Sequence, residues 1–68
     1  MYIVEFRTYT QYVGYFDDSD ELTEDETIEE EYNTLEDAKR EANKNKYGCR
    51  GQYVEVYING EYYRDYER

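Results

Sequence analysis

The fold is decided near the end of the chain, by YVEVYINGEYYRDYER at residues 53–68. Two runs of β-branched and aromatic residues flank Asn59-Gly60, a dipeptide that favours the two-residue turn of a β-hairpin. Such a turn places Tyr57 opposite Tyr62 and, further out, Tyr53 opposite Tyr66. One face of the hairpin would be mainly aliphatic and would pack on a helix, with Val54, Val56, Ile58 and Tyr63. The other face would be left uncovered and would carry Tyr53, Tyr57, Tyr62 and Tyr66.

A helix is predicted before this hairpin. Thr34 is a suitable N-cap residue, and Asp37 follows three positions later, where it can complete a capping box. Lys44 and Lys46 in the last turn would suit the helix dipole, and Gly48 would end the helix. The face toward the sheet would be narrow and built of small apolar residues, namely Leu35, Ala38 and Ala42.

Two further strands are predicted at the N-terminal end. Residues 2–9, YIVEFRTY, nearly alternate in polarity, which places Tyr2, Val4 and Phe6 on one face. Residues 11–16, QYVGYF, indicate a second strand in which the glycine suggests a bulge. A short turn near Tyr9–Gln11 would pair the two strands antiparallel.

An acidic segment separates these strands from the helix. Residues 17–31 contain ten carboxylates and no base. Neither the helical nor the strand period is strong there, so we expect an exposed loop in which Thr27–Tyr32 forms, at most, an edge strand. The order of elements predicts a single α+β domain over residues 1–68. It would be a ββαββ antiparallel sheet with one helix packed on one face.

The composition argues against catalysis. The chain of 68 residues has no histidine, so it lacks a histidine base, a Ser-His-Asp triad and a Cys/His zinc site. A calcium loop starting at Asp18 would place Thr23 where the sharp turn requires glycine. We therefore expect a protein that is not an enzyme and that binds no cofactor and no metal.

The same composition indicates a cytoplasmic location. The single cysteine, Cys49, allows no intrachain disulfide and fits a reducing compartment. No apolar stretch approaches the ~20 residues that span a bilayer, and the N-terminal residues lack the pattern of a signal peptide. A membrane is therefore not an expected partner.

The net charge of −10 falls entirely on the first half of the chain. A protein that binds nucleic acid directly would normally have the opposite sign. The carboxylates could instead imitate phosphates and bind a protein partner that has a basic nucleic-acid-binding groove. The candidate residues of this acidic surface are Asp17, Asp18, Asp20, Glu21, Glu24, Asp25, Glu26, Glu29, Glu30 and Glu31. We expect Glu29, Glu30 and Glu31 to matter most, because they lie nearest the start of the helix.

Eleven tyrosines in so short a chain are a second unusual feature. Tyrosine supplies a large contact area at low entropic cost and is enriched at interfaces. Some tyrosines would replace Leu and Phe in the core. The tyrosine face of the hairpin predicts a partner or homodimer interface, with Tyr57 and Tyr62 at its centre.

In size, and in the concentration of acids over residues 17–31, the chain resembles small inhibitors that phages and mobile elements direct against host defence. These include anti-CRISPR proteins and other DNA mimics. The resemblance implies a non-catalytic inhibitor that occupies the nucleic-acid site of an enzyme in the cytosol of a host cell. Our leading hypothesis takes a CRISPR effector as that enzyme. The alternative is a small homo-oligomeric accessory protein whose acidic loop keeps it in solution.

Overall fold

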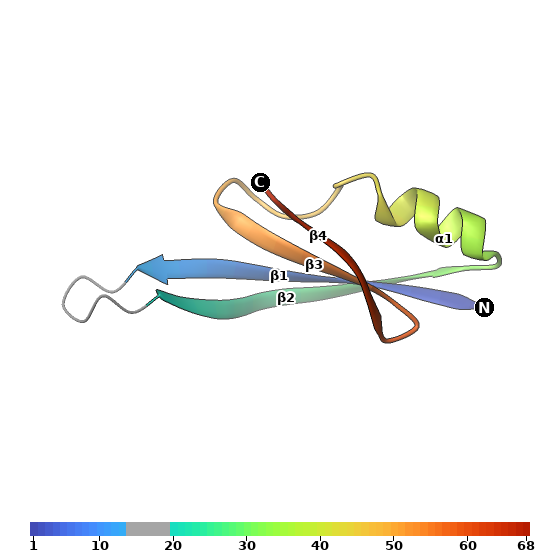
Figure 1. Cartoon of the computed structure of the whole chain (residues 1–68), viewed down its shortest axis with the longest axis horizontal. Coiled ribbons are helices and arrows are strands. Elements are labelled where there is room, and N and C mark those ends of the chain that lie inside the picture. The colour runs from blue at the N-terminus through green and yellow to red at the C-terminus, as the bar shows by residue number, and fades with distance from the viewer. Residues whose placement is uncertain (14–19) are drawn as a thin grey trace.

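The computed structural model describes the backbone of residues 1–13 and 20–68, and the side chains of residues 1–10 and 24–68. A 4-stranded antiparallel sheet has the order β2-β1-β3-β4, and one helix lies against one face of it (Figure 1). The elements are β1 (Tyr2–Val13), β2 (Asp20–Tyr32), α1 (Leu35–Ala42), β3 (Gln52–Ile58) and β4 (Glu61–Glu67). The predicted α+β, ββαββ architecture is confirmed.

Strand β1 is longer than predicted. The alternation over residues 2–9 is confirmed, because Val4 and Phe6 are fully buried. The predicted turn near Tyr9–Gln11 is wrong, since this stretch lacks a turn dipeptide and consists largely of strand-forming residues. The predicted second strand over residues 11–16 is therefore wrong in its first half, which belongs to β1. Its remainder lies outside the described residues.

The acidic segment contains a strand where a loop was predicted. β2 pairs with β1 from Tyr32 opposite Tyr2 to Asp20 opposite Val13. Strand preference depends strongly on the neighbouring strand, and β1 supplies a complete partner for residues with low strand propensity of their own. The edge position also leaves the carboxylates close to water. The expected edge strand over Thr27–Tyr32 is confirmed but extends further toward the N-terminus.

Helix α1 begins as predicted and ends earlier. The hydroxyl oxygen of Thr34 accepts a hydrogen bond from the backbone N–H of Asp37 at 3.2 Å, as an N-cap residue does. The predicted end at Gly48 is wrong because Asn43 caps the helix. Both the backbone N–H and the side-chain amide of Asn43 donate to the carbonyl oxygen of Lys39. The two lysines predicted for the last turn consequently lie in the following loop.

The C-terminal hairpin has the predicted turn but a different register. Asn59 and Gly60 both have positive φ, and Tyr57 lies opposite Tyr62 as expected. The register then shifts, so that Val54 lies opposite Tyr66 rather than opposite Asp65. A β-bulge of this kind turns the following residues to the other face. The placement of Tyr66 on the uncovered face is therefore wrong, because its side chain is only 8% exposed and belongs to the core.

The core lies between the sheet and α1. Two buried alanines, Ala38 and Ala42, let the helix backbone approach the sheet closely, mainly over β1 and β2. The rest of the core comes from the sheet, namely Val4, Phe6, Val54, Val56, Ile58 and Tyr66. Leu35, predicted for the same helix face, is 39% exposed. Because the helix face is small, tyrosines complete the cover, and the ring of Tyr47 packs 4.8 Å from that of Phe6.

Candidate binding surface

The face of the sheet opposite α1, here called the open face, is the candidate functional surface. The ladder registers assign its members, which extend over all four strands. Its acidic residues are Glu5, Glu24, Glu29, Glu31, Glu55, Asp65 and Glu67. Its aromatic residues are Tyr9, Tyr53, Tyr57 and Tyr62. Arg7 is its one base among the residues that the structure describes.

The acidic and aromatic residues are arranged in rows across the strands. One row joins Glu29 of β2 to Glu5 of β1, and continues to Tyr57 and Tyr62. Adjacent strands are about 4.8 Å apart, so carboxylates and phenol rings lie within reach of one partner surface. The acidic segment and the tyrosine face, which are far apart in sequence, thus form one continuous surface.

The centre of the open face is ordered by contacts between side chains. The ring of Tyr62 meets that of Tyr57 edge-on, with centroids 6.0 Å apart. The guanidinium of Arg7 lies 4.1 Å from the centroid of Tyr57 and is also paired with the carboxylate of Glu5. A cation over an aromatic ring is attracted by the ring quadrupole. Arg7 is therefore already paired within the open face. It leaves the carboxylates other than Glu5 to face a partner.

Partial burial and neighbouring carboxylates raise the pKa of three tyrosines on this face. A hydrogen bond donated to Asp65 raises the pKa of Tyr53 above its ordinary value. Partial burial, followed by the same carboxylate, raises the pKa of Tyr62. Burial and the nearby Glu55 also raise the pKa of Tyr9. These hydroxyl groups therefore remain protonated near neutral pH, and that of Tyr53 is already engaged with Asp65.

The acidic residues predicted to act together are divided between the two faces of β2. Glu24, Glu29 and Glu31 belong to the open face, while Glu26 and Glu30 lie on the side of α1. This separation follows from the alternation of a strand, which the expected loop would not have imposed. Glu29, Glu30 and Glu31 therefore do not share one face, and their joint effect on partner binding stays a prediction.

The remaining acidic residues have different positions. Asp25 lies at the register shift of β2 and accepts a hydrogen bond from the side-chain amide of Gln52 at 2.8 Å. The backbone of Asp20 and Glu21 belongs to β2, and their side chains lie outside the described part. Asp17 and Asp18 lie outside the described residues altogether.

Glu30 is committed to contacts within the protein. Its carboxylate accepts hydrogen bonds from the ammonium of Lys46 at 2.9 Å, from Tyr32 at 2.9 Å and from Tyr47 at 3.1 Å. Burial would raise the pKa of Glu30, but these donors hold it below its ordinary value. Glu41 pairs with the same ammonium at 3.1 Å. The network ties the loop after α1 to the edge of the sheet, so Glu30 serves the fold.

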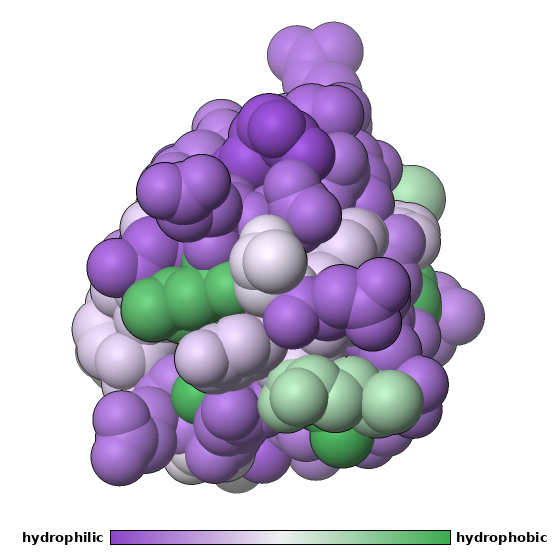
Figure 2. All heavy atoms as spheres, turned by 90° about the vertical axis from the view of Figure 1, so that its right-hand side faces the viewer, coloured by the Kyte–Doolittle hydropathy of each residue, from purple (hydrophilic) through white to green (hydrophobic). Residues whose placement is uncertain are grey.

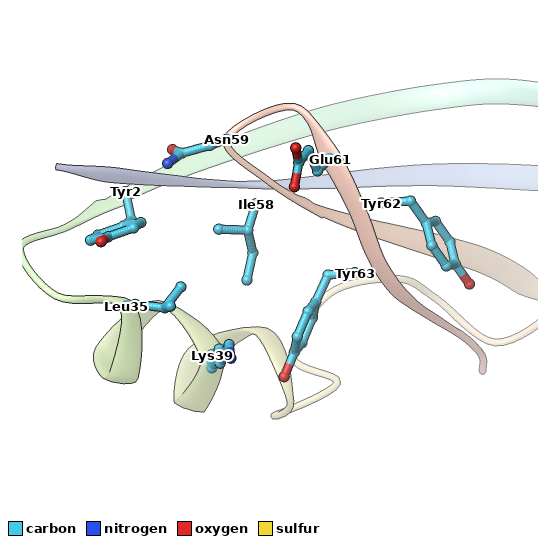
Figure 3. A pocket seen from close by; sticks show the side chains of 8 residues that line it. All are labelled: Tyr2, Leu35, Lys39, Ile58, Asn59, Glu61, Tyr62 and Tyr63. Carbon is cyan, nitrogen blue, oxygen red and sulfur yellow. The ribbon is translucent and has the colours of Figure 1, made fainter.

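A groove lies at the N-terminal end of the molecule, on the side of the sheet that α1 covers. It runs between the first turns of α1 and the β3–β4 turn (Figure 3). It encloses about 330 Å³ and is lined chiefly by Tyr2, Leu35, Ile58 and Tyr63. Lys39 and Glu61 supply charge at its border. Seen from this end, the surface is mostly hydrophilic, with separate apolar spots rather than one continuous apolar patch (Figure 2).

Several members of the open face were missed by sequence reasoning. Tyr9 continues the alternation of Glu5 and Arg7 along β1, a signal that was present in the sequence. Asp65 and Glu67 could not be assigned, because their face depends on the bulge in the hairpin.

Within residues 1–13 and 20–68, no helix is both long and apolar enough to cross a bilayer. Among the side chains of residues 1–10 and 24–68, no group of Cys, Asp and Glu is arranged to hold a metal ion. The chain matches no protein-family model, no curated protein and no solved structure.

Proposed function

We propose that this protein is a non-catalytic inhibitor that binds a nucleic-acid-binding protein through the open face. The single observation that carries the proposal is the meeting of acids from β2 with tyrosines from β3 and β4 on one uncovered side of the sheet. The partner would present a basic groove that ordinarily holds phosphates. A CRISPR effector in the cytosol of a host cell is the first candidate to test.

The chemistry of the face suits such a partner. Along a strand, successive residues on one face are about 6.8 Å apart, so Glu29 and Glu31 present charges in a regular line. The Arg and Lys side chains of a phosphate-binding groove can pair with these carboxylates and release the counterions bound to both surfaces. Tyr57 and Tyr62 add rigid aromatic area beside the charges, which favours a specific contact over diffuse attraction.

Charge also favours a different protein over a second copy of the same chain. In a homodimer built face to face, the acids of one open face would meet those of the other, with Arg7 already paired to Glu5. Like charges brought together in an interface cost free energy. The homo-oligomeric alternative therefore requires a surface other than the open face.

The test is binding to purified nucleic-acid enzymes, with a CRISPR effector first, at increasing salt and with competing DNA or RNA. The variant Glu29→Lys/Glu31→Lys changes the open face, and Glu26→Lys changes the other side of the same strand. We expect the double variant to weaken binding by at least about tenfold, mainly through a slower association rate. Glu26→Lys should have little effect.

Two results would contradict the proposal. Equal losses from both variants would indicate general attraction to an acidic protein, and binding that persists in excess nucleic acid would show that the nucleic-acid groove is not the site.

A further inference from the structure

The backbone edge of β2 is a second interaction surface, distinct from the side chains of the open face. β2 ends the strand order β2-β1-β3-β4, so it has a strand partner on one side only in the part of the chain that the structure describes. An edge strand presents a row of unpaired N–H and C=O groups that can accept another strand. Such groups alternate along the strand, because every second residue points its backbone polar groups outward.

The segment Glu26–Tyr32 is the regular part of this edge. It pairs with β1 from Thr8 to Tyr2 without a register shift, and the shift in the ladder comes only beyond Glu26. The segment contains no proline, which would remove a donor, and no glycine, which would loosen the strand. The other edge strand, β4, is interrupted by a register shift opposite β3. β2 is therefore the edge better formed to accept an added strand.

The side chains of β2 decide which strand can be added. Along this segment, Glu29 and Glu31 lie on the open face. A second copy of β2 would bring carboxylates opposite or diagonal to these in every register, and like charges in cross-strand positions are destabilising. A strand with lysine or arginine would instead place its bases against them. The acids thus oppose self-association and favour a basic strand.

We infer that β2 pairs, along Glu26–Tyr32, with an extended Lys/Arg-rich segment of the partner protein. The pairing adds a fifth strand to the sheet and supplies backbone hydrogen bonds as well as charge contacts. This inference rests on the proposed function, because it takes the basic partner from it, and it specifies how that partner is held. It places part of the binding free energy in the backbone, which open-face substitutions do not remove.

The test uses a capped ten-residue peptide of alternating lysine and valine as the probe. A control peptide has the same lysines but proline in place of two central valines, so it has equal charge and cannot form the ladder. Amide hydrogen exchange of the full chain, followed by NMR, and the dissociation constants of both peptides are measured. We expect alternate amides of Glu26–Tyr32 to gain protection with the first peptide, and the proline peptide to bind at least about tenfold more weakly.

Equal affinity of the two peptides, no binding of either, or no gain of protection on β2 would overturn the inference. The Tyr57→Ser/Tyr62→Ser variant separates it from the proposed function. This variant should bind the nucleic-acid enzyme at least about tenfold more weakly and keep strand pairing with the peptide. If the enzyme binds the unaltered protein without protecting β2 amides, the edge inference fails and the proposed function stands. If the peptide pairs and no nucleic-acid enzyme binds, the proposed function fails.

Discussion

The hydroxyl group of Tyr66 holds the backbone of Tyr47 by two hydrogen bonds. It donates to the carbonyl oxygen at 2.7 Å and accepts from the N–H at 3.2 Å. Tyr47 in turn covers Phe6 and donates to Glu30, so this one contact fixes the loop that follows α1. The bulge in the hairpin is what brings Tyr66 to this position.

The Tyr66→Phe substitution should therefore lower the free energy of unfolding by about 1–3 kcal/mol, because both backbone groups of Tyr47 lose a partner while partly buried. Urea unfolding followed by circular dichroism measures the change. Tyr53→Phe is the matched control, since its hydroxyl donates to Asp65 on the open face, where water can replace it. A loss as large in the control would show that the loop contact is not the cause.

Glu30 and Lys46 predict a pH dependence of stability. The pKa of Glu30 is lower in the folded protein than its ordinary value of 4.5. Its contribution to the free energy of unfolding is therefore complete above pH 4.5 and is lost as the pH falls through the pKa of the folded protein. Burial would lower the pKa of Lys46, but its hydrogen bonds to Glu30 and Glu41 raise it above the ordinary 10.5. That contribution is complete below 10.5 and is lost only as the pH rises through the folded value. Between about pH 5 and pH 10 both are present.

Glu30→Gln should lower stability by about 1–3 kcal/mol at pH 7. The difference from the unaltered protein should shrink below about pH 4.5, as the native carboxyl is protonated. Urea titrations of both proteins at several pH values measure this difference in the free energy of unfolding. The effect of the large net charge is nearly the same in both proteins and therefore largely cancels. Glu29→Gln, the adjacent residue on the open face, should change stability by less than about 0.5 kcal/mol at any of these pH values. A Glu30→Gln difference that is constant with pH would argue against the Glu30–Lys46 pair as its source.

Gly48 is required by its surroundings as well as by its backbone. A Cβ atom there would lie 2.7 Å from a methyl group of Val54, in the core, and φ is +98°. Gly51 has a similar φ of +90° with nothing within 4 Å of a Cβ atom. Gly48→Ala should cost about 2–4 kcal/mol, from overpacking added to backbone strain, and Gly51→Ala about 1–2 kcal/mol from strain alone. Thermal unfolding of both variants compares the two, and equal losses would mean that the Val54 contact relaxes without cost.

The open-face tyrosines should contribute to binding more than to folding. Tyr62 is 57% exposed, and Tyr57 packs chiefly against Tyr62 and Arg7 on the same face. Tyr57→Ser/Tyr62→Ser should weaken binding to the partner by tenfold or more and lower the free energy of unfolding by less than about 1.5 kcal/mol. Calorimetric binding and urea unfolding of the same variant give both quantities. Unfolding of the variant at room temperature would place these rings in the core.

Local signals in the sequence predicted the parts of the fold that local chemistry determines. Thr34 starts the helix and Asn59-Gly60 makes the turn, because each acts on residues only a few positions away. β2 could not be predicted in this way. Its acids have little strand preference of their own, and they become a strand because β1 offers a complete set of backbone partners.

The candidate surface was also predicted only in part, because some of its residues are placed by contacts between strands rather than by local sequence. Tyr53, Tyr57 and Tyr62 were assigned to one face correctly, since they lie before or close to the turn that sets the register. Tyr66 was misplaced, because a single extra residue in β4 reverses the faces beyond it. The union of acids and tyrosines on one face depends on the strand order, which no local pattern in this chain reveals.

The central position of β1 also determines when the protein can fold during its synthesis. Within this chain β1 precedes β2, and its other neighbour, β3, follows only after β2, α1 and the loop between α1 and β3. Until then the side chains of Val4 and Phe6 lack the strand that shields them, and unfinished apolar surfaces of this kind promote aggregation. The pairing of β1 with β2 has a shorter sequence separation than that of β1 with β3, so we expect it to form earlier. We therefore expect the nascent chain to pair β1 first with its most highly charged strand, whose carboxylates would oppose aggregation until β3 has been made.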